Sequence, residues 1–510
     1  MRVSAFFCLI YNIYSKDALL IIVKYSRYAI LCLILGFISM TTNVSCVKEV
    51  AYLEDNGAKL RFSCDTVAFD TVFVTMGTTT QQVLVYNTYD NPILLTRVAV
   101  RGGASSRFRI NVDGDTSLVV SNITIPAHDS IFIFVTANIN PNSSSSPFLV
   151  EDAIDFDFCN AHQSLILTAY GRNAVYHTPN MTLSDQDGNL IGYASIIDCA
   201  NWNHSMPHVI TGIALVANGA TLHLNPGEEV YMANNSHLIV LENSTLKVSG
   251  SRESPVRFTS VRHDGWYDSL PGQWGYLWFS GGSIDNEIDH AVIENGTIGI
   301  LADTNVNGNP TVRITNTLIQ NHQLYGILSQ SCAHIEGENL LVTSCGSALV
   351  ALNAGGNFHF GNSTFANFWR YGGRQVPAVA ISNYYEARVN GVDRVVVRDI
   401  VRAEFDNCII DGSFSLDGGG EVSLAQVEEG QFNVLFHNCL VKSRQVMAFS
   451  ENSQVCSDVR YVAPSAYDYR PKSDSPAAGA GDHNKVILPY DLNGTLRAIP
   501  PTIGAYEAIQ

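Results

Sequence analysis

The sequence has 510 residues, of which 46% are hydrophobic and 15% are charged, and it contains 39 glycines. A chain of this length and composition is expected to fold into more than one β-rich domain, which excludes the class of intrinsically disordered proteins. The formal net charge of −17 argues against a nucleic-acid partner and against adhesion to anionic lipid headgroups, so it indicates solubility or a basic partner.

The first 45 residues are predicted to be a leader. An apolar run at 29–41 follows basic residues and is short for a membrane span. Cys46 then stands where a lipoprotein signal peptide is cut and the thiol is diacylated, with the small Ser45 directly before it. Asn43 occupies a position that is usually Leu, so a retained membrane anchor with an ordinary Cys46 is the alternative. We expect lipidation of Cys46.

Residues 46–172 are predicted to form a separate all-β domain. The stretches 69–103, 130–139 and 164–171 alternate apolar and polar residues, and turn residues separate their strands. Short strands with frequent turns indicate an immunoglobulin-like sandwich, which resembles the Hydin/choice-of-anchor type of bacterial surface proteins. We expect a spacer or interaction module, because the segment has no nucleophile–base pairing and no metal-ligand spacing.

The segment 173–205 is expected to be a linker. Within it, SDQDGNL (184–190) has part of the acidic spacing of a calcium loop but lacks the remaining ligands, so a hairpin turn is favoured. None of the eleven cysteines stands in a CxxC or zinc spacing, and no HExxH motif occurs. The sequence therefore predicts no metal site and no cofactor.

From about residue 288 to residue 443 the sequence repeats itself with a period of about 20–30 residues, as solenoids do. Apolar residues alternate with small polar ones, so each repeat is predicted to be a coil of three short strands. One position holds Asn in most copies, which suits a bend because Asn tolerates the left-handed backbone region and bonds its own main chain. This structural column consists of His290, Asn316, Asn339, Asn362, Asn407 and Asn438.

Repeats such as IDHAVIEN (288–295) resemble those of right-handed parallel β-helix proteins, the group that contains pectate lyases and polygalacturonases. The stretches 219–262 and 268–300 are similar to β-helix lipoproteins of Bacteroidetes-type bacteria. The resemblance implies an all-β chain in which an N-terminal β-sandwich is followed by a right-handed parallel β-helix solenoid at 206–455 and a C-terminal cap at 456–510. It also implies a place at the outer membrane or cell surface, but it implies no particular activity.

An aromatic cluster lies between residues 263 and 279, where three of the five tryptophans are found. The alternation of Trp274, Tyr276 and Trp278 predicts one face of a strand, and Trp266 lies close by. Flat aromatic rings can stack on the C–H faces of sugars, so these four residues are candidate ligand-binding residues. Packing against the early coils is the alternative.

The longest interruption of the repeat is 369–403, which is rich in Arg within an otherwise acidic protein. Loops on the side of a solenoid build its binding surfaces, and guanidinium groups suit an acidic polysaccharide. Trp369, Arg370 and Arg374 are therefore further candidate ligand-binding residues. A charge-balanced surface excursion is the alternative.

Catalysis is not predicted, although it stays open. Asp406, Asp411, Asp417 and Glu421 lie close together in sequence but match no catalytic motif of a lyase or polygalacturonase. The favoured function is that of an envelope-anchored surface lipoprotein with a non-catalytic binding or structural role, with glycans as the leading ligand class. The alternative is a polysaccharide lyase or glycoside hydrolase acting on an acidic polysaccharide along the β-helix flank, and a purely structural envelope protein is the third.

The partners that follow from this interpretation are polysaccharides or surface proteins, and no nucleic acid. A lipid anchor would hold the protein on the outer membrane or cell surface, with the periplasmic face as an alternative. The sequence predicts neither the ligand nor the oligomeric state.

Overall fold

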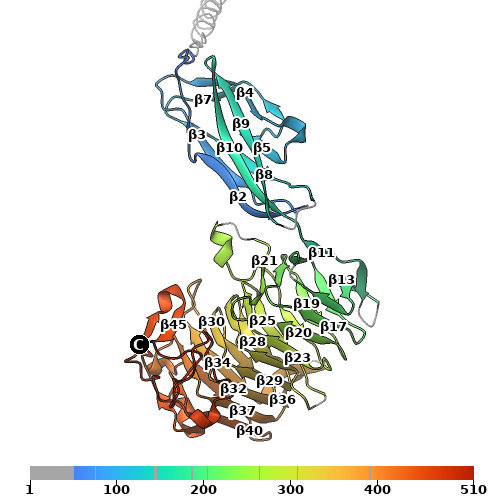
Figure 1. The fold of residues 1–510 in the computed structure, drawn as a ribbon, viewed down its shortest axis with the longest axis vertical. Helices are drawn as coiled ribbons and strands as arrows, with labels where there is room; N and C mark the ends of the chain where they lie inside the picture. Colours follow the sequence, from blue (N-terminus) through green and yellow to red (C-terminus); the bar gives the residue numbers. More distant parts are fainter. Residues whose placement is uncertain are drawn as a thin grey trace, which may run out of the picture.

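The computed structural model describes residues 51–509 except 75, 143–145, 185–187, 204, 263–264, 307 and 390–391. The predicted leader and Cys46 lie outside the described residues. The described chain forms a β-sandwich followed by a long parallel β-solenoid (Figure 1), which is the all-β architecture that the sequence predicts. Its helical elements are short 3-10 turns, and no helix in the described part is long and apolar enough to cross a membrane.

The N-terminal domain consists of two sheets that share one apolar core. One sheet has the order β1-β3-β8-β5, and the other has the order β2-β10-β9-β4-β6 with β7 paired to β4. Buried and exposed residues alternate along strands such as β8, because successive side chains point to opposite faces of a sheet. The strands are β1 (Arg61–Phe62), β2 (Thr66–Phe73), β3 (Gln81–Tyr86), β4 (Ile93–Val100), β5 (Phe108–Val112), β6 (Val119–Val120), β7 (Ile123–Ile125), β8 (Ser130–Ala137), β9 (Phe148–Phe158) and β10 (Ala161–Arg172), with the turn η1 (Gly103–Ser105) after β4.

The solenoid is a parallel β-helix with three faces, here called faces 1, 2 and 3 in the order in which the chain visits them. Face 1 contains β11 (Val175–His177), β15 (His208–Ile210), β18 (Glu229–Met232), β21 (Val256–Ser260), β24 (Ala291–Glu294), β27 (Leu318–His322), β30 (Leu341–Cys345), β33 (Thr364–Asn367), β38 (Ile409–Gly412), β41 (Leu440–Val441) and β43 (Gln454–Val455). Face 2 contains β12 (Met181–Ser184), β13 (Leu190–Ile197), β16 (Ile213–Val216), β19 (His237–Val240), β22 (Leu277–Phe279), β25 (Ile298–Ala302), β28 (Tyr325–Ser329), β31 (Val350–Leu352), β34 (Val379–Ser382) and β39 (Val422–Ala425). Face 3 contains β14 (Ala200–Trp202), β17 (Thr221–Leu224), β20 (Thr245–Ser249), β23 (Asn286–Asp289), β26 (Val312–Thr315), β29 (Ala333–Glu338), β32 (Gly356–Gly361), β37 (Ile400–Asp406), β40 (Phe432–His437) and β42 (Ser450–Glu451).

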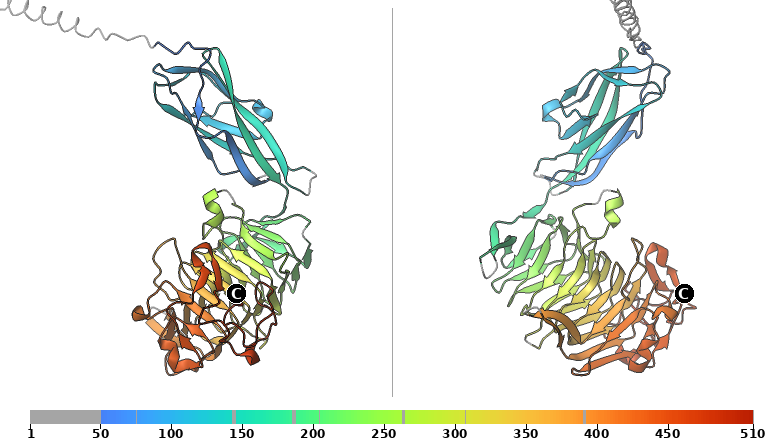
Figure 2. Two further views of the ribbon diagram at one scale, coloured as in Figure 1. Left: turned by 60° about the vertical axis from the view of Figure 1, so that its left-hand side comes forward. Right: turned by 180° about the vertical axis from the view of Figure 1, so that it is seen from behind.

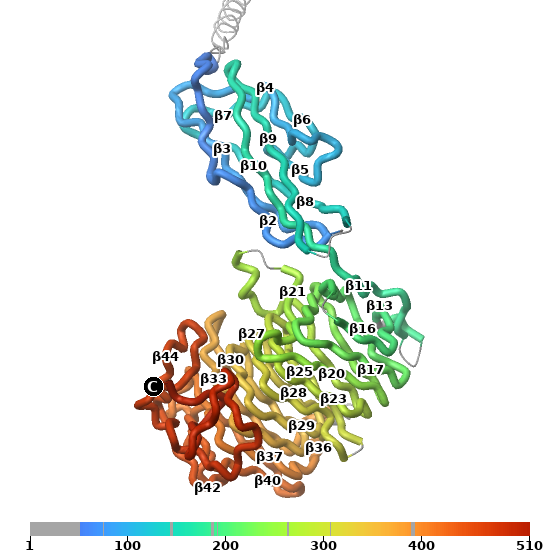
Figure 3. Tube along the Cα trace, viewed as in Figure 1, coloured from blue at the N-terminus to red at the C-terminus, as the bar shows by residue number. Residues whose placement is uncertain are grey.

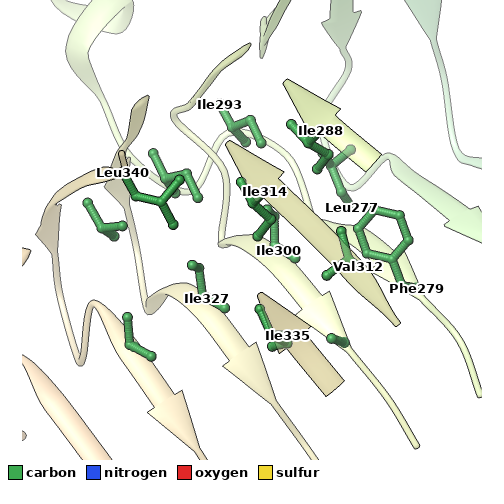
Figure 4. Packing of buried hydrophobic residues seen from close by; sticks show 14 of the residues in the cluster. Leu277, Phe279, Ile288, Ile293, Ile300, Val312, Ile314, Ile327, Ile335 and Leu340 are labelled. Carbon is green, nitrogen blue, oxygen red and sulfur yellow. The ribbon is translucent and has the colours of Figure 1, made fainter. Parts of the chain in front are cut away.

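Equivalent residues of successive coils stack directly on one another. Val312 pairs with Ile335, which pairs with Phe358 in the following coil. The side chains that point inward fill the interior (Figure 4). There, Leu277 and Phe279 of face 2 belong to the same apolar cluster as Ile288 of face 3. Because every interior position meets its own equivalent above and below, one alternating pattern buries a continuous apolar core.

The solenoid begins earlier than the sequence predicts. β11 pairs in parallel with β15, β13 with β16 and β14 with β17, so residues 175–202 form a first coil and not a linker. This coil lacks the aliphatic repeat because aromatic rings cover the start of the core. Trp202 stacks on His208 with ring centroids 3.8 Å apart and on His177 with centroids 4.8 Å apart.

The column of Asn residues lies at the bend from face 3 to face 1. Its members have φ values between 43° and 56°, in the left-handed region that Asn tolerates. The side-chain amides bond along the solenoid axis: Asn339 Nδ2 donates to Asn316 Oδ1 at 3.0 Å, and Asn407 Nδ2 lies 3.4 Å from Asn362 Oδ1. The column therefore orders the bends of successive coils.

The 369–403 interruption has three parts. A loop runs from β33 to β34, the strand β34 belongs to face 2, and a hairpin of β35 (Tyr384–Val389) and β36 (Val392–Val397) projects before β37. One regular strand and two excursions thus account for the long step in the repeat.

The predicted cap segment, as far as the structure describes it, packs along the side of the solenoid. The short turn η4 (Gln445–Phe449) places Val446 in the interior core at the last coil. Residues 456–509 instead lie along the side of the β-helix (Figure 2), where β44 (Tyr461–Ala463), η5 (Pro464–Ala466) and β45 (Asp468–Pro471) cover the outer side of face 1. Figure 3 shows β44 next to β30 and β33. The cover is needed there because apolar residues of face 1, such as Leu341 and Ile409, point outward.

After this cover the chain returns along the Asn column. We call residues 480–494, which include η6 (His483–Lys485), the strap. Asn407 donates to the Asp482 carbonyl at 2.9 Å and accepts from the Asp482 amide at 2.7 Å. Asn339 donates to the Tyr490 carbonyl at 2.6 Å. The Asn side chains therefore bind both one another and the strap.

Candidate functional site

A cleft with an exposed aromatic wall lies where the sandwich meets the solenoid. It has a volume of 570 Å³ and is lined by residues 78–81, which join β2 to β3, and by Arg262, Gly265, Trp266 and Tyr267, which follow β21. Figure 1 shows the yellow-green turn η2 (Gly265–Ser269) rising toward the sandwich. We call this the aromatic cleft.

The cleft combines an apolar ring surface with polar groups. The side chain of Trp266 is 67% exposed, whereas the Arg262 guanidinium carbon lies 3.1 Å from the centroid of the Tyr267 ring. The facing loop supplies hydroxyls from Thr78, Thr79 and Thr80 and the amide of Gln81. Such a mixture of one flat ring with convergent donors and acceptors is typical of small-molecule and sugar sites.

The turn that carries Trp266 is held by hydrogen bonds from several coils. Asn321 Nδ2 donates to the Ser269 carbonyl at 2.5 Å, and Asn295 Nδ2 donates to the Asp268 carbonyl at 2.9 Å. Tyr371 Oη, from the loop after β33, also donates to the Ser269 carbonyl at 2.5 Å. These bonds hold the end of the turn that carries Trp266, which lowers the entropy cost of ordering this turn when a ligand binds.

Contacts between the two domains lie next to the aromatic cleft. Arg172 Nη1 donates to Tyr231 Oη at 3.0 Å, and the rings of Phe73 and Tyr231 meet edge to face with centroids 4.6 Å apart. Phe73 also lines a 190 Å³ cavity that adjoins the aromatic cleft and shares Arg262 with it. The sandwich is therefore packed against the first coils at this junction.

The other three aromatic candidates of the 263–279 segment do not join this cleft. Trp274 is 1% exposed, and its Nε1 donates to the Glu294 carbonyl at 2.8 Å. Its ring enters the interior above Gly296, where a Cβ atom would come within 2.9 Å of it. Tyr276 and Trp278 lie half-buried on the outer side of face 2 with their rings edge to face. The expected common face of the three rings is wrong, because Trp274 precedes β22 and turns inward.

The candidates of the 369–403 stretch are bound by the protein itself. Arg374 is 1% exposed and pairs with Glu421, whose side chain is fully buried. Arg370 donates to the Ser465 carbonyl at 2.5 Å and lies over the Tyr467 ring at 4.6 Å.

Trp369 is likewise engaged. Its ring packs against Tyr371 with centroids 5.1 Å apart and against Gly346, where a Cβ atom would meet it at 3.0 Å. These three residues therefore fasten the loop, and of the seven candidates Trp266 is the one that is exposed in a cleft.

The acidic residues that are close in sequence have different partners in the structure. Asp417 lies in the exposed turn η3 (Leu416–Gly418), Glu421 faces Arg374, and Asp411 points outward from face 1. Asp406 ends β37 on face 3 and is 4% exposed.

Asp406 is stabilised as an anion. Its Oδ2 lies 3.0 Å from His359 Nε2 and 3.3 Å from Lys485 Nζ of the strap. Burial opposes ionisation, but the hydrogen bond from His359 and the charge of Lys485 outweigh it and lower the pKa of the Asp406 carboxyl.

Glu338 has the opposite electrostatic environment. It is 5% exposed, and burial raises the pKa of its carboxyl although Asn362 donates to Oε1 at 2.7 Å. Glu338 stacks on Gly361, which stacks on Asp406, so one residue without a side chain separates the two carboxylates along face 3. Ile487 and Leu488 of the strap lie over this place.

The described residues contain no cluster of side chains that could bind a metal ion. No group of three or more His, Cys, Asp or Glu side chains among these residues could hold a metal ion. The possible calcium loop at 184–190 falls partly on residues 185–187, which lie outside the described residues.

The residues of the aromatic cleft that sequence analysis missed are 78–81 and Arg262. The run Thr78-Thr79-Thr80-Gln81 stands about 180 residues before Arg262 in the sequence and follows a glycine, so it has the pattern of an ordinary turn. The hydroxyl-rich loop at 78–81 can be recognised as part of a site only when the folded structure places it beside the aromatic residues.

The comparisons with known proteins assign this chain to no family. No protein-family model and no curated protein sequence matches the chain. Among solved structures, a family 123 glycoside hydrolase from Clostridium perfringens is 8% identical, with 22% of this chain and 26% of that chain covered and a TM-score of 0.16. The chain thus spans about a quarter of that enzyme.

Two further structures were compared. An ASH/PapD-like domain of human CEP192 is 7% identical over 26% of this chain and 96% of that chain, with a TM-score of 0.17. The catalytic unit of a GH87 α-1,3-glucanase from Streptomyces thermodiastaticus strain HF3-3 is 13% identical over 73% of this chain and 84% of that chain, with a TM-score of 0.24. All three scores are low, so the fold of this chain rests on its own strand pairing.

Proposed function

We propose that this protein is an envelope-anchored surface lipoprotein that binds glycan chains without cleaving them, through the aromatic cleft. The observation that carries the proposal is Trp266, which is 67% exposed and lines a cleft of 570 Å³, on a turn that the neighbouring coils bond at Asp268 and Ser269. An exposed flat ring beside hydrogen-bonding groups is suited to stacking on a pyranose.

The chemistry of the opposite wall supports a sugar as the ligand. The hydroxyl of Thr80 and the amide of Gln81 can each donate and accept, as the hydroxyl groups of a sugar require, and the Thr78 hydroxyl, which accepts from the Ala137 amide at 2.8 Å, can still donate. A glycan chain would lie with one ring on Trp266 and its hydroxyls toward this loop. The volume of the cleft is in the range typical of small-molecule sites.

The anchoring part of the proposal rests on the leader. The apolar run at 29–41 and Cys46 support export and lipidation, after which the sandwich would hold the solenoid away from the membrane. Metabolic labelling with an alkynyl fatty acid tests this directly. Label on the natural protein that is lost in Cys46→Ser is the expected outcome, and label that persists in the variant would contradict it.

The binding part is tested with the protein that begins at residue 47. Affinity electrophoresis in gels containing neutral or acidic polysaccharides should show retardation that Trp266→Ala abolishes. Tyr193→Ala is the matched control, because Tyr193 is an exposed aromatic residue (57%) on β13, away from the cleft. Equal retardation of both variants, or no retardation by any glycan, would contradict glycan binding at this site.

A second candidate function is a polysaccharide lyase or glycoside hydrolase, which Glu338 and Asp406 favour. Environments that shift two carboxyl pKa values in opposite directions are typical of acid and base partners. Two strand spacings of about 4.8 Å separate their main chains, because Gly361 lies between them in the stack.

Binding without cleavage ranks first because the strap covers both carboxylates. Release of reducing ends, or ultraviolet absorbance of an unsaturated uronate, would report catalysis. If activity appears and is lost in Glu338→Gln while Trp266→Ala retains part of it, the enzymatic alternative replaces the leading proposal.

A further inference from the structure

A second large cleft lies between the end of the strap and the bend from face 3 to face 1. It has a volume of 610 Å³ and is lined by the loop 250–253 after β20, by the strap residues 488–492 and 494, and by Asp289, His290 and Asn316 of the bend. We call it the strap cleft. It shares no lining residue with the aromatic cleft and does not depend on it.

The strap cleft lies where the amide ladder of the Asn column ends. Farther along the column, Asn339 and Asn407 bond to the strap. Asn316 instead donates through Nδ2 to Asp289 Oδ1 at 2.9 Å, and the column position before it holds His290. The polar groups of this bend therefore line an open space instead of bonding to the strap.

Asp289 is an accessible carboxylate that is held in its charged form. Its side chain is 43% exposed, its Oδ1 also accepts from Thr315 Oγ1 at 2.6 Å, and its Oδ2 lies 2.9 Å from His290 Nδ1. Burial opposes ionisation, but the hydrogen bonds from Thr315 and Asn316 outweigh it and lower the pKa of the Asp289 carboxyl. Its ion-pair contact among the described residues is with a His, so no Lys or Arg is bonded to it.

The lining as a whole is acidic. Arg252 is the guanidinium in the lining, and it is already paired with Glu253, Nη2 to Oε1 at 2.7 Å. Asp491 is 4% exposed and is bonded by backbone amides, whereas Asp289 is both exposed and without a permanent positive partner among the described residues. The cleft therefore attracts a positive group and repels an anion.

The strap supplies an apolar surface beside this charge. Tyr490 is 55% exposed, and Leu488 and Leu492 line the same cleft. The main chain of Tyr490 is held by Asn339, which donates to its carbonyl at 2.6 Å. An exposed Tyr ring can attract an ammonium group to its face, and aliphatic side chains can cover the hydrocarbon chain that carries such a group.

Arg252 links the loop 250–253 to the strap. Its Nη1 donates to the Asn493 carbonyl at 3.2 Å, and Gly494 makes room for it, because a Cβ atom there would lie 1.6 Å from this nitrogen. Gly250 links the same loop to the bend, since its amide donates to the Asp289 carbonyl at 2.9 Å. The segments that line the cleft are thus bonded to one another, which lowers the cost of ordering them when a ligand binds.

We propose that the strap cleft binds an alkylammonium group, which is an ammonium on an aliphatic chain, as in Lys side chains and polyamines. The ammonium would donate to Asp289 and lie near the ring of Tyr490, and its chain would pack on Leu488 and Leu492. The net charge of −17 favours the encounter with such a ligand. A neutral sugar would leave the charge of Asp289 uncompensated, and an anion would be repelled by it.

Isothermal titration of the protein that begins at residue 47 with pentalysine and with spermidine, at low ionic strength, tests the proposal. At least one of the two should bind, and Asp289→Asn should weaken this binding about tenfold, the effect of one charge-assisted hydrogen bond. Tyr490→Ala should weaken it about twofold to fivefold, whereas Tyr490→Phe, which keeps the ring, should not. Binding of spermidine as tightly as pentalysine would indicate a polyamine, and binding of pentalysine alone would indicate a basic protein partner.

Variants elsewhere are the controls, because an acidic protein attracts cations over its whole surface. Asp393→Asn removes a carboxylate that is 82% exposed on β36, and Tyr193→Ala removes a ring that is 57% exposed on β13; neither should change the affinity. Asp289→Asn keeps the Oδ1 acceptor of Thr315 and Asn316, so it is expected to fold, and its thermal midpoint checks this.

Two results would overturn the proposal. One is that neither cation binds, or that both bind equally to the natural protein, Asp289→Asn and Tyr490→Ala. The other is that hexanoate or maltose binds in place of the cations with an affinity that Tyr490→Ala lowers, which would assign the cleft to a different ligand class.

Discussion

Arg374 and Glu421 form an ion pair that is shielded from water. Nη2 of Arg374 lies 2.6 Å from Oε1 of Glu421, and the two side chains are 1% and 0% exposed. Glu421 also accepts hydrogen bonds from the amides of Ala378, at 2.9 Å, and Phe414, at 2.7 Å. The pair thereby ties the loop before β34 to the chain that leads into β39.

Loss of Arg374 should destabilise the solenoid strongly. Arg374→Ala leaves the Glu421 carboxylate buried without its counter-charge, which typically costs about 3–5 kcal/mol of unfolding free energy. Equilibrium denaturation monitored on the solenoid transition measures this. Arg388→Ala is the control, because the pair of Arg388 with Asp393 is exposed (74% and 82%) and should change stability little. Similar effects of the two variants would contradict the shielded role of Arg374.

Truncation of Trp274 should destabilise the protein, whereas truncation of Trp266 should not. Trp274→Ala removes a ring that is 1% exposed from the interior core and should cost about 3–5 kcal/mol. Trp266→Ala should leave the thermal midpoint almost unchanged, since its ring is mostly in water. Thermal unfolding of both variants, side by side, gives the comparison. A stable Trp274→Ala protein would show that the ring does not belong to the core.

Asn407 should be replaceable by Gly with less loss than by Ala. Its φ of 51° strains any residue with a Cβ atom that lacks the local hydrogen bonds of Asn, by about 1–2 kcal/mol, whereas Gly adopts it freely. Both variants lose the two hydrogen bonds to Asp482 and should free the strap. Denaturation gives the stability order, and limited proteolysis should cut within 480–494 faster in both. Unchanged proteolysis would contradict the anchoring of the strap by Asn407.

Stability should fall as the pH drops from about 6.5 toward 4, in part because of His322. This side chain is 0% exposed and lies 3.1 Å from the Ile293 carbonyl through Nε2, and burial lowers its pKa to about 4. The unfolded chain, with an ordinary pKa near 6.5, therefore binds more protons in this range, and acid favours unfolding by up to about 3 kcal/mol for the residue.

Thermal midpoints between pH 7 and pH 4 test this expectation. His322→Gln should have a shallower decline than the natural protein, whereas the exposed His483→Gln should follow the natural curve. Burial lowers the pKa of His177 to about 4 and that of His208 to about 3, so a residual decline with the same sign should remain. Parallel curves for the natural protein and His322→Gln would contradict the role of His322.

The solenoid could be predicted because each coil repeats the same environment. Interior positions such as Val312, Ile335 and Phe358 stack in register. The alternation of apolar and polar residues therefore predicts the strands that the fold adopts in each coil. The Asn column could be predicted for the same reason, since one backbone conformation recurs at each bend. The first coil was not predictable in this way, because His177, Trp202 and His208 stack there in place of aliphatic residues.

The candidate site was predictable only in part. Trp266 could be proposed because it lies in an aromatic-rich segment. Whether Trp274 points outward or into the core depends on where β22 starts, and it starts three residues later, at Leu277. Arg370 and Arg374 have the composition of a binding loop, and the residues that neutralise or bond them, Ser465 and Glu421, lie 95 and 47 residues farther along the chain. No local pattern contains those partners.

The sequence by itself determined the strands, their period and the bends between coils, because these follow from short-range alternation and backbone preference. The tertiary structure alone decided which aromatic rings are exposed, which charges are paired, and where the C-terminal segment lies. Those properties depend on residues brought together from distant parts of the chain, such as Asn407 with Asp482 or Trp266 with the loop at 78–81. Whether a side chain is buried or paired depends on the folded structure, whereas the period of the strands can be read from the sequence.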